Sequence, residues 1–258
     1  MNTKSPILLE AIEVEKHYGK FAALGGVSLQ VRANTVHSVI GPNGAGKTTL
    51  FHMLTGTKTV SGGRILFDGQ DVTDEPDYRR VQRGIARSFQ VTSLFLTLSV
   101  RENLRLGAQG VAPIHALNPW HEPVGARAQS EVVEAVLAKV GLEAFADTPA
   151  GNLSHGQQRR LEVGMALSAR PKAIFLDEPT SGMGIDDLEE MKRLIKSLRD
   201  QHTVVLIEHN MNIVMDISDT VTVMQMGRVL AEGLPHDIRS DDRVRTAYLG
   251  NMITGGKA

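Results

Sequence analysis

The stretch GPNGAGKTT, residues 41–49, decides the fold of this 258-residue chain. It fits the pattern G-x-x-x-x-G-K-[ST], which cradles phosphate where a strand precedes it and a helix follows. Residues 36–40 are predicted to form a buried strand, and residues 49–54 the first turns of a helix. Glycines permit a tight turn whose N–H groups point at phosphate oxygens, and the helix N-terminus adds positive potential. We therefore predict a phosphate-binding loop, not a glycine-rich turn without a ligand.

The positions of this loop have distinct expected roles. Lys47 supplies a positive charge for the β- and γ-phosphates, and the hydroxyl of Thr48 is a ligand for Mg²⁺. Further contacts to the nucleotide are expected from the rest of the loop and the helix start, namely Gly41, Asn43, Gly44, Ala45, Gly46 and Thr49. The stretch thus predicts a site for a nucleotide together with Mg²⁺.

The composition is that of an ordinary globular protein, with 41% hydrophobic and 22% charged residues. A net charge of −1 gives no global basic field, so nucleic acid is not an expected partner. The absence of cysteine excludes disulfides and thiolate metal sites. No apolar run approaches the ~20 residues needed to span a bilayer, and residues 1–16 do not resemble a secretory signal. We expect a soluble, cytoplasmic protein that can still dock on membrane subunits.

Two further buried strands are predicted to end in polar side chains. Residues 172–178, KAIFLDE, close on Asp177 and Glu178, and residues 203–207, TVVLI, are soon followed by His209. Asp177 is placed to hold Mg²⁺ through water, and Glu178 to polarise a water that attacks the γ-phosphate. His209 is placed to hydrogen-bond the γ-phosphate, because ligands of open α/β sheets gather at this edge. The alternatives are an acidic loop and a structural histidine.

Three other positions have a functional and a structural interpretation. Ser154 and the N–H of Gly156 stand where LSHGQ enters a helix, which makes either a second anion site or an ordinary N-cap. Gln90 follows an apolar run, and its amide either reaches Mg²⁺ or an attacking water or merely ends a strand. Tyr18 lies in a predicted turn, where it either stacks on a nucleobase or belongs to the core.

The rest of the chain is predicted to alternate short strands and helices. Residues 7–75 form a β-rich layer around the phosphate-binding unit, and residues 107–128 form an irregular insertion rich in proline and glycine. Apolar periodicity predicts helices at 77–87, 129–142, 157–169, 186–200 and 213–218. Turn residues predict one hairpin, which turns at Met226 and Gly227. After residue 234 we expect a short helix and then a frayed end.

In their order and spacing, GPNGAGKTT, Gln90, LSHGQ, AIFLDE and His209 resemble the motifs of ABC-type ATPases, over nearly the whole chain. The resemblance implies an α/β P-loop NTPase fold with a RecA-like core, an N-terminal antiparallel β-subdomain and an α-helical subdomain that carries the signature. It implies one ATPase domain over 7–250, with core and β-subdomain at 7–94 and 169–235, helical subdomain at 95–168, and a C-terminal helix and tail at 236–258.

The same resemblance implies roles for matching residues. Tyr18 would stack on adenine, and Gln90 would be the Q-loop glutamine that meets the coupling helix of a membrane partner. LSHGQ would be the signature, in which Ser154, Gly156 and Gln157 contact ATP. Asp177 and Glu178 would close the Walker B strand, and His209 would be the switch histidine. ATP and Mg²⁺ are the implied ligands.

More narrowly, RSFQ, the insertion, GQQRRLEV, LIEHNM and AYLG are similar to ATPase subunits of branched-chain amino acid importers. Subunits that serve urea or related solutes, or lipopolysaccharide export, share the pattern. The resemblance implies a subunit that dimerises with a second ATPase around two ATP molecules. It would lie peripherally at the cytoplasmic face of the inner membrane, with two permease subunits and, indirectly, a solute-binding protein. The rivals are a soluble ABC ATPase acting on DNA or ribosomes and a small-molecule P-loop kinase.

Two segments depart from the ABC pattern. His155 takes the third place of the signature, where glycine is usual, and Gly184 and Ile185 replace the aspartate and proline that often follow Walker B. The departure at Gly184 and Ile185 removes the aspartate that normally makes a cross-subunit contact. A lower intrinsic ATPase rate, or dependence on a partner ATPase of the more usual sequence, is the expected consequence of that departure.

Overall fold

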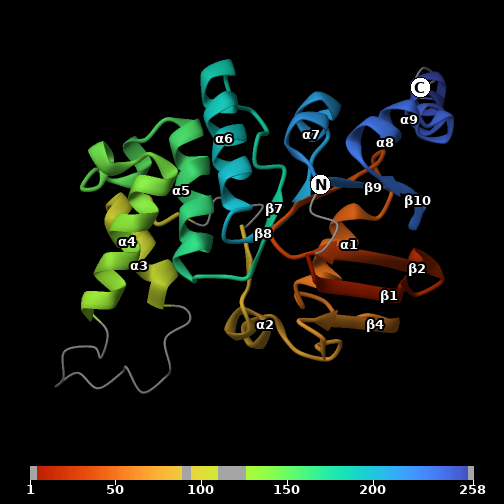
Figure 1. The fold of residues 1–258 in the computed structure, drawn as a ribbon, viewed down its shortest axis with the longest axis horizontal. Coiled ribbons are helices and arrows are strands. Elements are labelled where there is room, and N and C mark those ends of the chain that lie inside the picture. The colour runs from red at the N-terminus through yellow and green to blue at the C-terminus, as the bar shows by residue number, and fades with distance from the viewer. Residues whose placement is uncertain (1–4, 89–93, 110–125, 255–258) are drawn as a thin grey trace. The chain divides into compact units, whose positions relative to one another are not determined.

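The computed structural model describes residues 5–88, 94–109 and 126–254, and Figure 1 shows its helices and strands. The chain divides into two compact units. The first unit combines the chain up to Arg80 with the chain from Ile195 onward, and the second is Val81–Leu194. The phosphate-binding loop belongs to the first unit and LSHGQ to the second.

The first unit holds an antiparallel sheet in the order β2-β1-β4-β5. Its strands are β1 (Ile7–Tyr18), β2 (Phe21–Arg32), β4 (Gly62–Phe67) and β5 (Gln70–Asp71). Alternate side chains are buried at Leu9 and Ala11 of β1 and at residues 27, 29 and 31 of β2, as expected for a sheet with one face on the core. The predicted β-rich layer is therefore confirmed.

A second group of strands in the first unit positions the phosphate-binding loop. Strand β3 (Val36–Ile40) runs parallel to both β8 (Thr203–Ile207) and β9 (Thr220–Gln225), with which it pairs on either side. Strand β10 (Arg228–Gly233) returns antiparallel to β9. All residues of β3 and β8 are buried, which explains why neither strand alternates in polarity.

Helices complete the first unit, with α1 (Lys47–Leu54) directly after the loop, α2 (Asp77–Arg83) at the unit's boundary, and α7 (Met211–Ile217) after β8. Arg80 is fully buried, and its guanidinium donates to the carbonyl oxygens of Met53 (2.7 Å) and Leu54 (2.8 Å) at the end of α1. A cation at a helix C-terminus opposes the negative end of the helix dipole. Arg80 therefore caps the C-terminal end of α1, the helix that follows the phosphate-binding loop.

The end of the chain differs from the prediction of one short helix and a frayed tail. It forms two helices, α8 (Pro235–Ser240) and α9 (Asp242–Thr254). Pro235 starts α8, and the extended backbone of Asp241 (ψ 117°) separates the two helices. Val244 and Ala247 of α9 are buried, so tertiary packing holds a segment whose sequence shows no clear apolar helical face.

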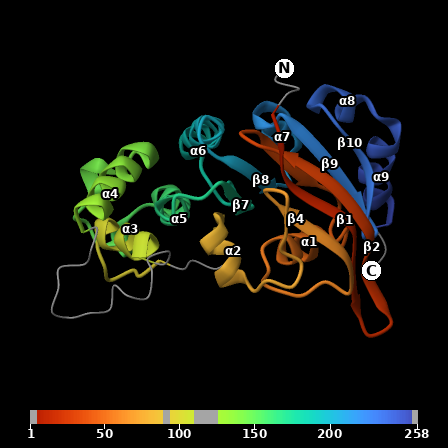
Figure 2. The same ribbon diagram turned by 60° about the horizontal axis from the view of Figure 1, so that its bottom comes forward.

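In the second unit, β6 (Ile85–Arg87) runs parallel to β7 (Ala173–Asp177). Three helices pack on one another, namely α3 (Val100–Gln109), α4 (Ala126–Val140) and α5 (His155–Ser168), as Figure 2 also shows. The unit also holds the short 3₁₀ helices η2 (Glu143–Phe145) and η3 (Ala150–Asn152) and the start of α6 (Ile185–Leu198). None of the helices that the structure describes is both long and apolar enough to cross a membrane.

The predicted irregular insertion over 107–128 is wrong at both ends. Helix α3 continues to Gln109, and α4 already begins at Ala126. Gly107 is a packing contact and not a helix breaker, since a Cβ there would lie 2.5 Å from the carbonyl oxygen of Met165 in α5. Residues 110–125 lie outside the described residues.

Candidate nucleotide-binding site

Three glycines set the shape of the loop between β3 and α1. Gly41 (φ 150°), Gly44 (φ 78°) and Gly46 (φ 98°) all have backbone angles that other residues rarely adopt. A Cβ on Gly41 would lie 2.2 Å from the carbonyl oxygen of Met224, and one on Gly46 would lie 2.9 Å from that of Ala23. A Cβ on Gly44 would meet nothing within 4 Å. Two glycines therefore let the loop pack against β9 and β2, and the third faces open space that a ligand can enter.

Lys47 places a positive charge inside this loop. Its side chain is buried, and its ammonium donates to the carbonyl oxygens of Gly41 (2.8 Å) and Pro42 (3.1 Å). Gly46 is the N-cap of α1 and has no side chain with which to cap the first-turn N–H groups. The ammonium and the helix N-terminus attract the same kind of ligand, an anion with several oxygens. The loop therefore fits a nucleotide phosphate.

The other predicted loop residues occupy the mouth and the base of the same turn. Asn43 is exposed and Ala45 is buried, while Thr48 and Thr49 are half-buried in the first turn of α1. The carbonyl oxygen of Ala45 accepts a hydrogen bond from the N–H of Gly227 (3.0 Å), which ties the loop to the β9–β10 turn. This hydrogen bond could not be predicted from local sequence pattern, because it joins residues far apart in the chain.

Asp177 ends β7 with a carboxylate that is wholly buried and lies 3.7 Å from the Arg87 guanidinium, measured from Oδ2 to Nη2. Arg87 comes from β6, the parallel neighbour of β7. Burial lowers the pKa of Arg87, and the charge of Asp177 opposes that shift. Sequence reasoning missed Arg87, although it opens the motif RSFQ that contains Gln90.

Glu178 follows Asp177 with a left-handed backbone (φ 50°). This conformation costs a non-glycine residue roughly 1–2 kcal/mol, and such strain gathers at functional sites. The side chain is half-buried, and the carbonyl oxygen accepts from the N–H of Ser181 (3.1 Å). The strained turn sets the direction in which the carboxylate leaves the strand.

Ser154 and Gln157 form a reciprocal cap at the start of α5. The hydroxyl of Ser154 accepts from the N–H of Gln157 (3.2 Å), and Gln157 Oε1 accepts from the N–H of Ser154 (2.9 Å). Ser154 is therefore an N-cap, and its role in a second anion site stays a prediction.

Position 156 has no space for a side chain, because Asp187 of α6 lies beside it. A Cβ on Gly156 would lie 2.0 Å from Cγ of Asp187, so this carboxylate lies directly against the start of α5. Negative charge is favourable at a helix N-terminus. Sequence reasoning missed Asp187, because residues of α6 give no local sign of facing α5.

The two departures from the ABC pattern lie on neighbouring segments of the second unit. A Cβ on Gly182, in the stretch after β7, would lie 3.4 Å from Cε1 of His155. The imidazole of His155 is exposed and lies close to Gly182. Gly184 itself would accept a Cβ without contact within 4 Å.

Tyr18 and His209 are exposed, so the alternative interpretation of Tyr18 as a core residue is wrong. Tyr18 is 44% exposed, and the Nζ atoms of Lys16 and Lys58 lie 5.5 and 5.4 Å from its ring centroid. His209 stands between β8 and α7, and its N–H donates to the Glu208 carboxylate (3.2 Å). Both side chains lie where a ligand can reach them.

Gln90, the third predicted Mg²⁺ ligand, lies outside the described residues. In the part of the chain that the structure describes, no group of three or more His, Asp or Glu forms a metal site. The remaining candidates, the Thr48 hydroxyl and the Asp177 carboxylate, are oxygen ligands of the kind that Mg²⁺ prefers. A metal held partly by nucleotide oxygens needs only one or two such protein ligands.

Comparison with known families agrees with this geometry, since residues 24–181 match the family model described as "ABC transporter". The chain belongs to the ABC transporter family. It is an ATPase with the P-loop NTPase fold, and the predicted fold class is confirmed. Residues 228–252 also match a model described as "Branched-chain amino acid ATP-binding cassette transporter".

Several relatives align with nearly the whole of this ABC ATPase. A high-affinity branched-chain amino acid transport ATP-binding protein of Pseudomonas aeruginosa is 39% identical, over 94% of this chain and 98% of its own length. Its counterpart in Escherichia coli K12 is 37% identical with the same coverage. A lipopolysaccharide export ATP-binding protein of Haemophilus influenzae is 32% identical over 95% of this chain and 98% of its own length.

Solved structures are similar over the same span. The ADP conformation of an ATP-binding cassette of an ABC transporter has a TM-score of 0.85 and 32% identity, covering 95% of this chain and 100% of that one. A nucleotide-free cassette has a TM-score of 0.83 and 31% identity, covering 94% and 99%.

Proposed function

We propose that this ABC ATPase drives the import of branched-chain amino acids. The match of residues 228–252 to the branched-chain family model carries this proposal, and relatives named for that transport support it. The lipopolysaccharide export relative is less similar, at 32% identity. Export of lipopolysaccharide, and import of urea or related amides, are the alternative functions.

ATP binding is assigned to the loop and its surroundings. Lys47 and the backbone N–H groups of residues 41–49 bind the phosphates, because the loop gathers positive groups around open space. The exposed ring of Tyr18 stacks on the adenine. Lys16 and Lys58 beside that ring add positive charge near the nucleotide.

Hydrolysis is assigned to residues that follow β7 and β8. Glu178 orients and polarises the attacking water, and His209 hydrogen-bonds the γ-phosphate. Thr48, Asp177 and Gln90 hold Mg²⁺, which neutralises charge on the phosphate oxygens when it is bound. The Arg87 guanidinium lies 3.7 Å from the buried Asp177 carboxylate and supplies an opposite charge beside it.

A second ATPase subunit is part of the proposal. The phosphate-binding loop and LSHGQ are both suited to anions, so ATP held by the loop of one subunit is completed by Ser154 and Gly156 of the other. Closure on ATP and opening after hydrolysis follow, because the γ-phosphate contacts differ between the two states. Two permease subunits and a solute-binding protein complete the importer, and the ATPase lies peripherally at the cytoplasmic face of the cell membrane.

Uptake of labelled leucine, isoleucine and valine tests the transport proposal. Cells that lack the gene should lose uptake of all three, and the wild-type gene should restore it. Restoration should fail with Glu178→Gln, whose turnover we expect to fall about 100-fold or more because the general base is lost. Unchanged uptake together with a defect in lipopolysaccharide export or urea uptake would replace this proposal with the corresponding alternative.

A further inference from the structure

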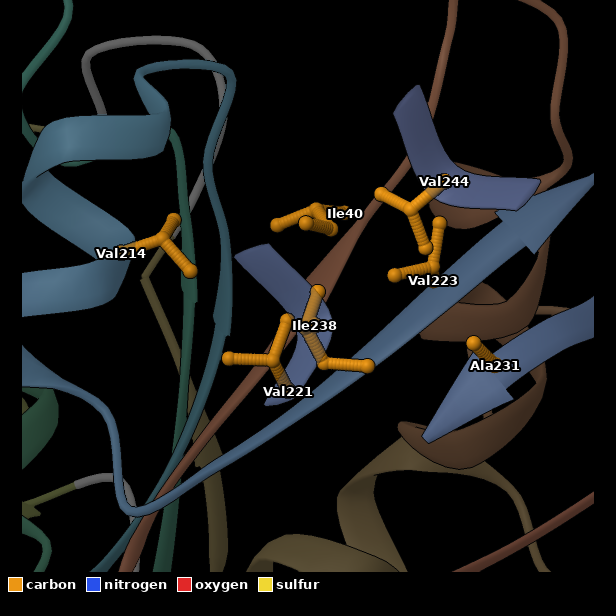
Figure 3. Close-up of a cluster of buried hydrophobic side chains, with 7 residues drawn as sticks. All are labelled: Ile40, Val214, Val221, Val223, Ala231, Ile238 and Val244. Atoms are coloured by element: carbon orange, nitrogen blue, oxygen red, sulfur yellow. The ribbon is translucent and has the colours of Figure 1, made fainter. Parts of the chain in front are cut away.

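The turn between β9 and β10 lies directly against the phosphate-binding loop. Strands β3 and β9 are paired so that Ile40 stands opposite Val223, which brings the residues after each strand side by side. Ile40 and Val223 belong to one buried cluster that also contains Ala231 of β10 (Figure 3). The same core therefore holds the strand that enters the loop and the two strands that the turn joins.

This turn is a two-residue hairpin, because Gln225 pairs with Arg228 across it. Its two residues, Met226 (φ 47°) and Gly227 (φ 74°), are both left-handed, as in a type I′ turn, where asparagine, aspartate and glycine are preferred. The Met226 side chain is 85% exposed, so its burial does not offset the strained backbone. The backbone of the turn, rather than this side chain, therefore makes the contacts that favour its shape.

Both polar backbone groups of Gly227 form hydrogen bonds. Its N–H donates to the carbonyl oxygen of Ala45 (3.0 Å), and its carbonyl oxygen accepts from the N–H of Gly25 in β2 (2.9 Å). A Cβ on Gly227 would lie 2.6 Å from the carbonyl oxygen of Ala23, and one on Gly46 would lie 3.4 Å from the Cα of Gly227. The loop, the turn and β2 therefore meet through backbone atoms, with no room for a side chain at position 227.

The hydrogen bond from Gly227 orients the peptide group that joins Ala45 to Gly46. A trans peptide is planar, so its C=O and N–H point in opposite directions. Because the Ala45 oxygen faces the turn, the Gly46 N–H faces away from it. A peptide that is oriented before a ligand arrives loses less conformational entropy on binding, and glycine has the most to lose.

We propose that Gly227 is a positioning residue for ATP binding, which orients the peptide between Ala45 and Gly46 so that the Gly46 N–H can donate to a phosphate oxygen. The proposal rests on the assignment of residues 41–49 as the ATP site. Its new element is that a turn far along the chain sets the direction of one amide of that loop. Gly227 acts through the loop and not through contact with the nucleotide.

Gly227→Ala tests the proposal, with Gly69→Ala as the matched control. A Cβ at position 227 meets the Ala23 carbonyl oxygen, so the turn has to shift, whereas a Cβ at position 69 would meet nothing within 4 Å. Gly69 (φ 74°) also follows a left-handed residue, Asp68, in the two-residue turn between β4 and β5. Both variants therefore strain the backbone alike, and both should unfold at a lower urea concentration.

Only Gly227→Ala should weaken ATP binding, by about three- to tenfold, the loss that one hydrogen bond of ordinary strength gives. KM for ATP should rise by the same factor while kcat changes less than about twofold, since uniform binding is lost. Gly69→Ala should leave the ATP Kd and KM unchanged.

Replacement of Gly227 by glycolic acid provides a second variant, which keeps the test possible if Gly227→Ala does not fold. This exchange turns the amide into an ester, so the donor N–H is deleted and no methyl group is added. We expect the same three- to tenfold loss of ATP affinity, about the value of one hydrogen bond. The same exchange at Gly69 should leave ATP affinity unchanged.

The proposal is overturned if the folded Gly227 variants bind ATP like the wild type, or if the same changes at Gly69 weaken ATP binding as much. In the second case the turn acts only through stability. Failure of the underlying assignment gives a different result, because Lys47→Ala would then retain normal ATP binding.

Discussion

Helices α1 and α5 both begin at motifs that suit anions, but their first turns are built in opposite ways. Helix α1 starts from a glycine N-cap and has no acidic residue in its first turn, and Lys47 lies buried beside it. Helix α5 starts from the reciprocal cap of Ser154 and Gln157, and the Asp187 carboxylate lies against Gly156. The start of α1 has a positive charge beside it. The start of α5, in contrast, already contacts a hydroxyl, an amide and a carboxylate oxygen of its own subunit.

This difference separates two kinds of anion site. The α1 end can take phosphate directly, because glycine leaves its N–H groups without a side-chain cap. The α5 end can take phosphate only beside, or in place of, groups that it already contacts. We infer that the α1 end supplies most of the ATP affinity and that the α5 end makes affinity depend on a second subunit.

Among the substitutions that test this comparison, Lys47→Ala should have the largest effect. We expect ATP affinity of the isolated subunit to fall about 100-fold, because a buried charge-assisted contact to phosphate is lost. Isothermal titration with ATP gives the measurement. Lys196→Ala is the matched control, since Lys196 forms an exposed ion pair with Asp216 and should leave ATP binding unchanged. Near-normal affinity in Lys47→Ala would remove the distinction between the two helices.

Ser154→Ala should have a smaller effect, and on different quantities. Loss of the cap should lower the free energy of unfolding by about 1 kcal/mol, seen in urea denaturation. ATP affinity of the isolated subunit should not change, while ATP-dependent association of two subunits, measured by sedimentation, should weaken. Ser240→Ala is a control on an exposed helix end. A fall in ATP affinity of the isolated subunit would show that α5 contributes to binding without a partner.

Asp187→Asn should have the smallest effect on stability, a loss of about 0.3–1 kcal/mol from the helix-dipole contact. Association of two ATP-loaded subunits should become stronger, because a like charge near the incoming phosphate is removed. Asp186→Asn, a neighbouring exposed carboxylate in the same turn of α6, provides the control. Weaker association in Asp187→Asn would mean that the carboxylate helps the second subunit to bind.

Most of the fold could be predicted from local pattern. The strands at Val36–Ile40, Ala173–Asp177 and Thr203–Ile207 follow from short apolar runs, and the loop follows from its glycines and Lys47. The exact subdomain limits, and the roles of Glu178, His209 and Gln90, stay predictions. The predicted insertion began too early in the chain, because Gly107 looks like a helix breaker in sequence. In the structure, Gly107 lies within α3 and allows this helix to contact α5 closely.

The sequence by itself determined the kind of ligand, because phosphate binding needs particular residue types at fixed local spacing. Only the tertiary structure decided which contacts hold the site in shape: Arg87 beside Asp177, and Asp187 against Gly156. These pairs join segments far apart in the chain, and their distances follow from how strands and helices pack. No local pattern records such packing, so its consequences become visible only once the chain has folded.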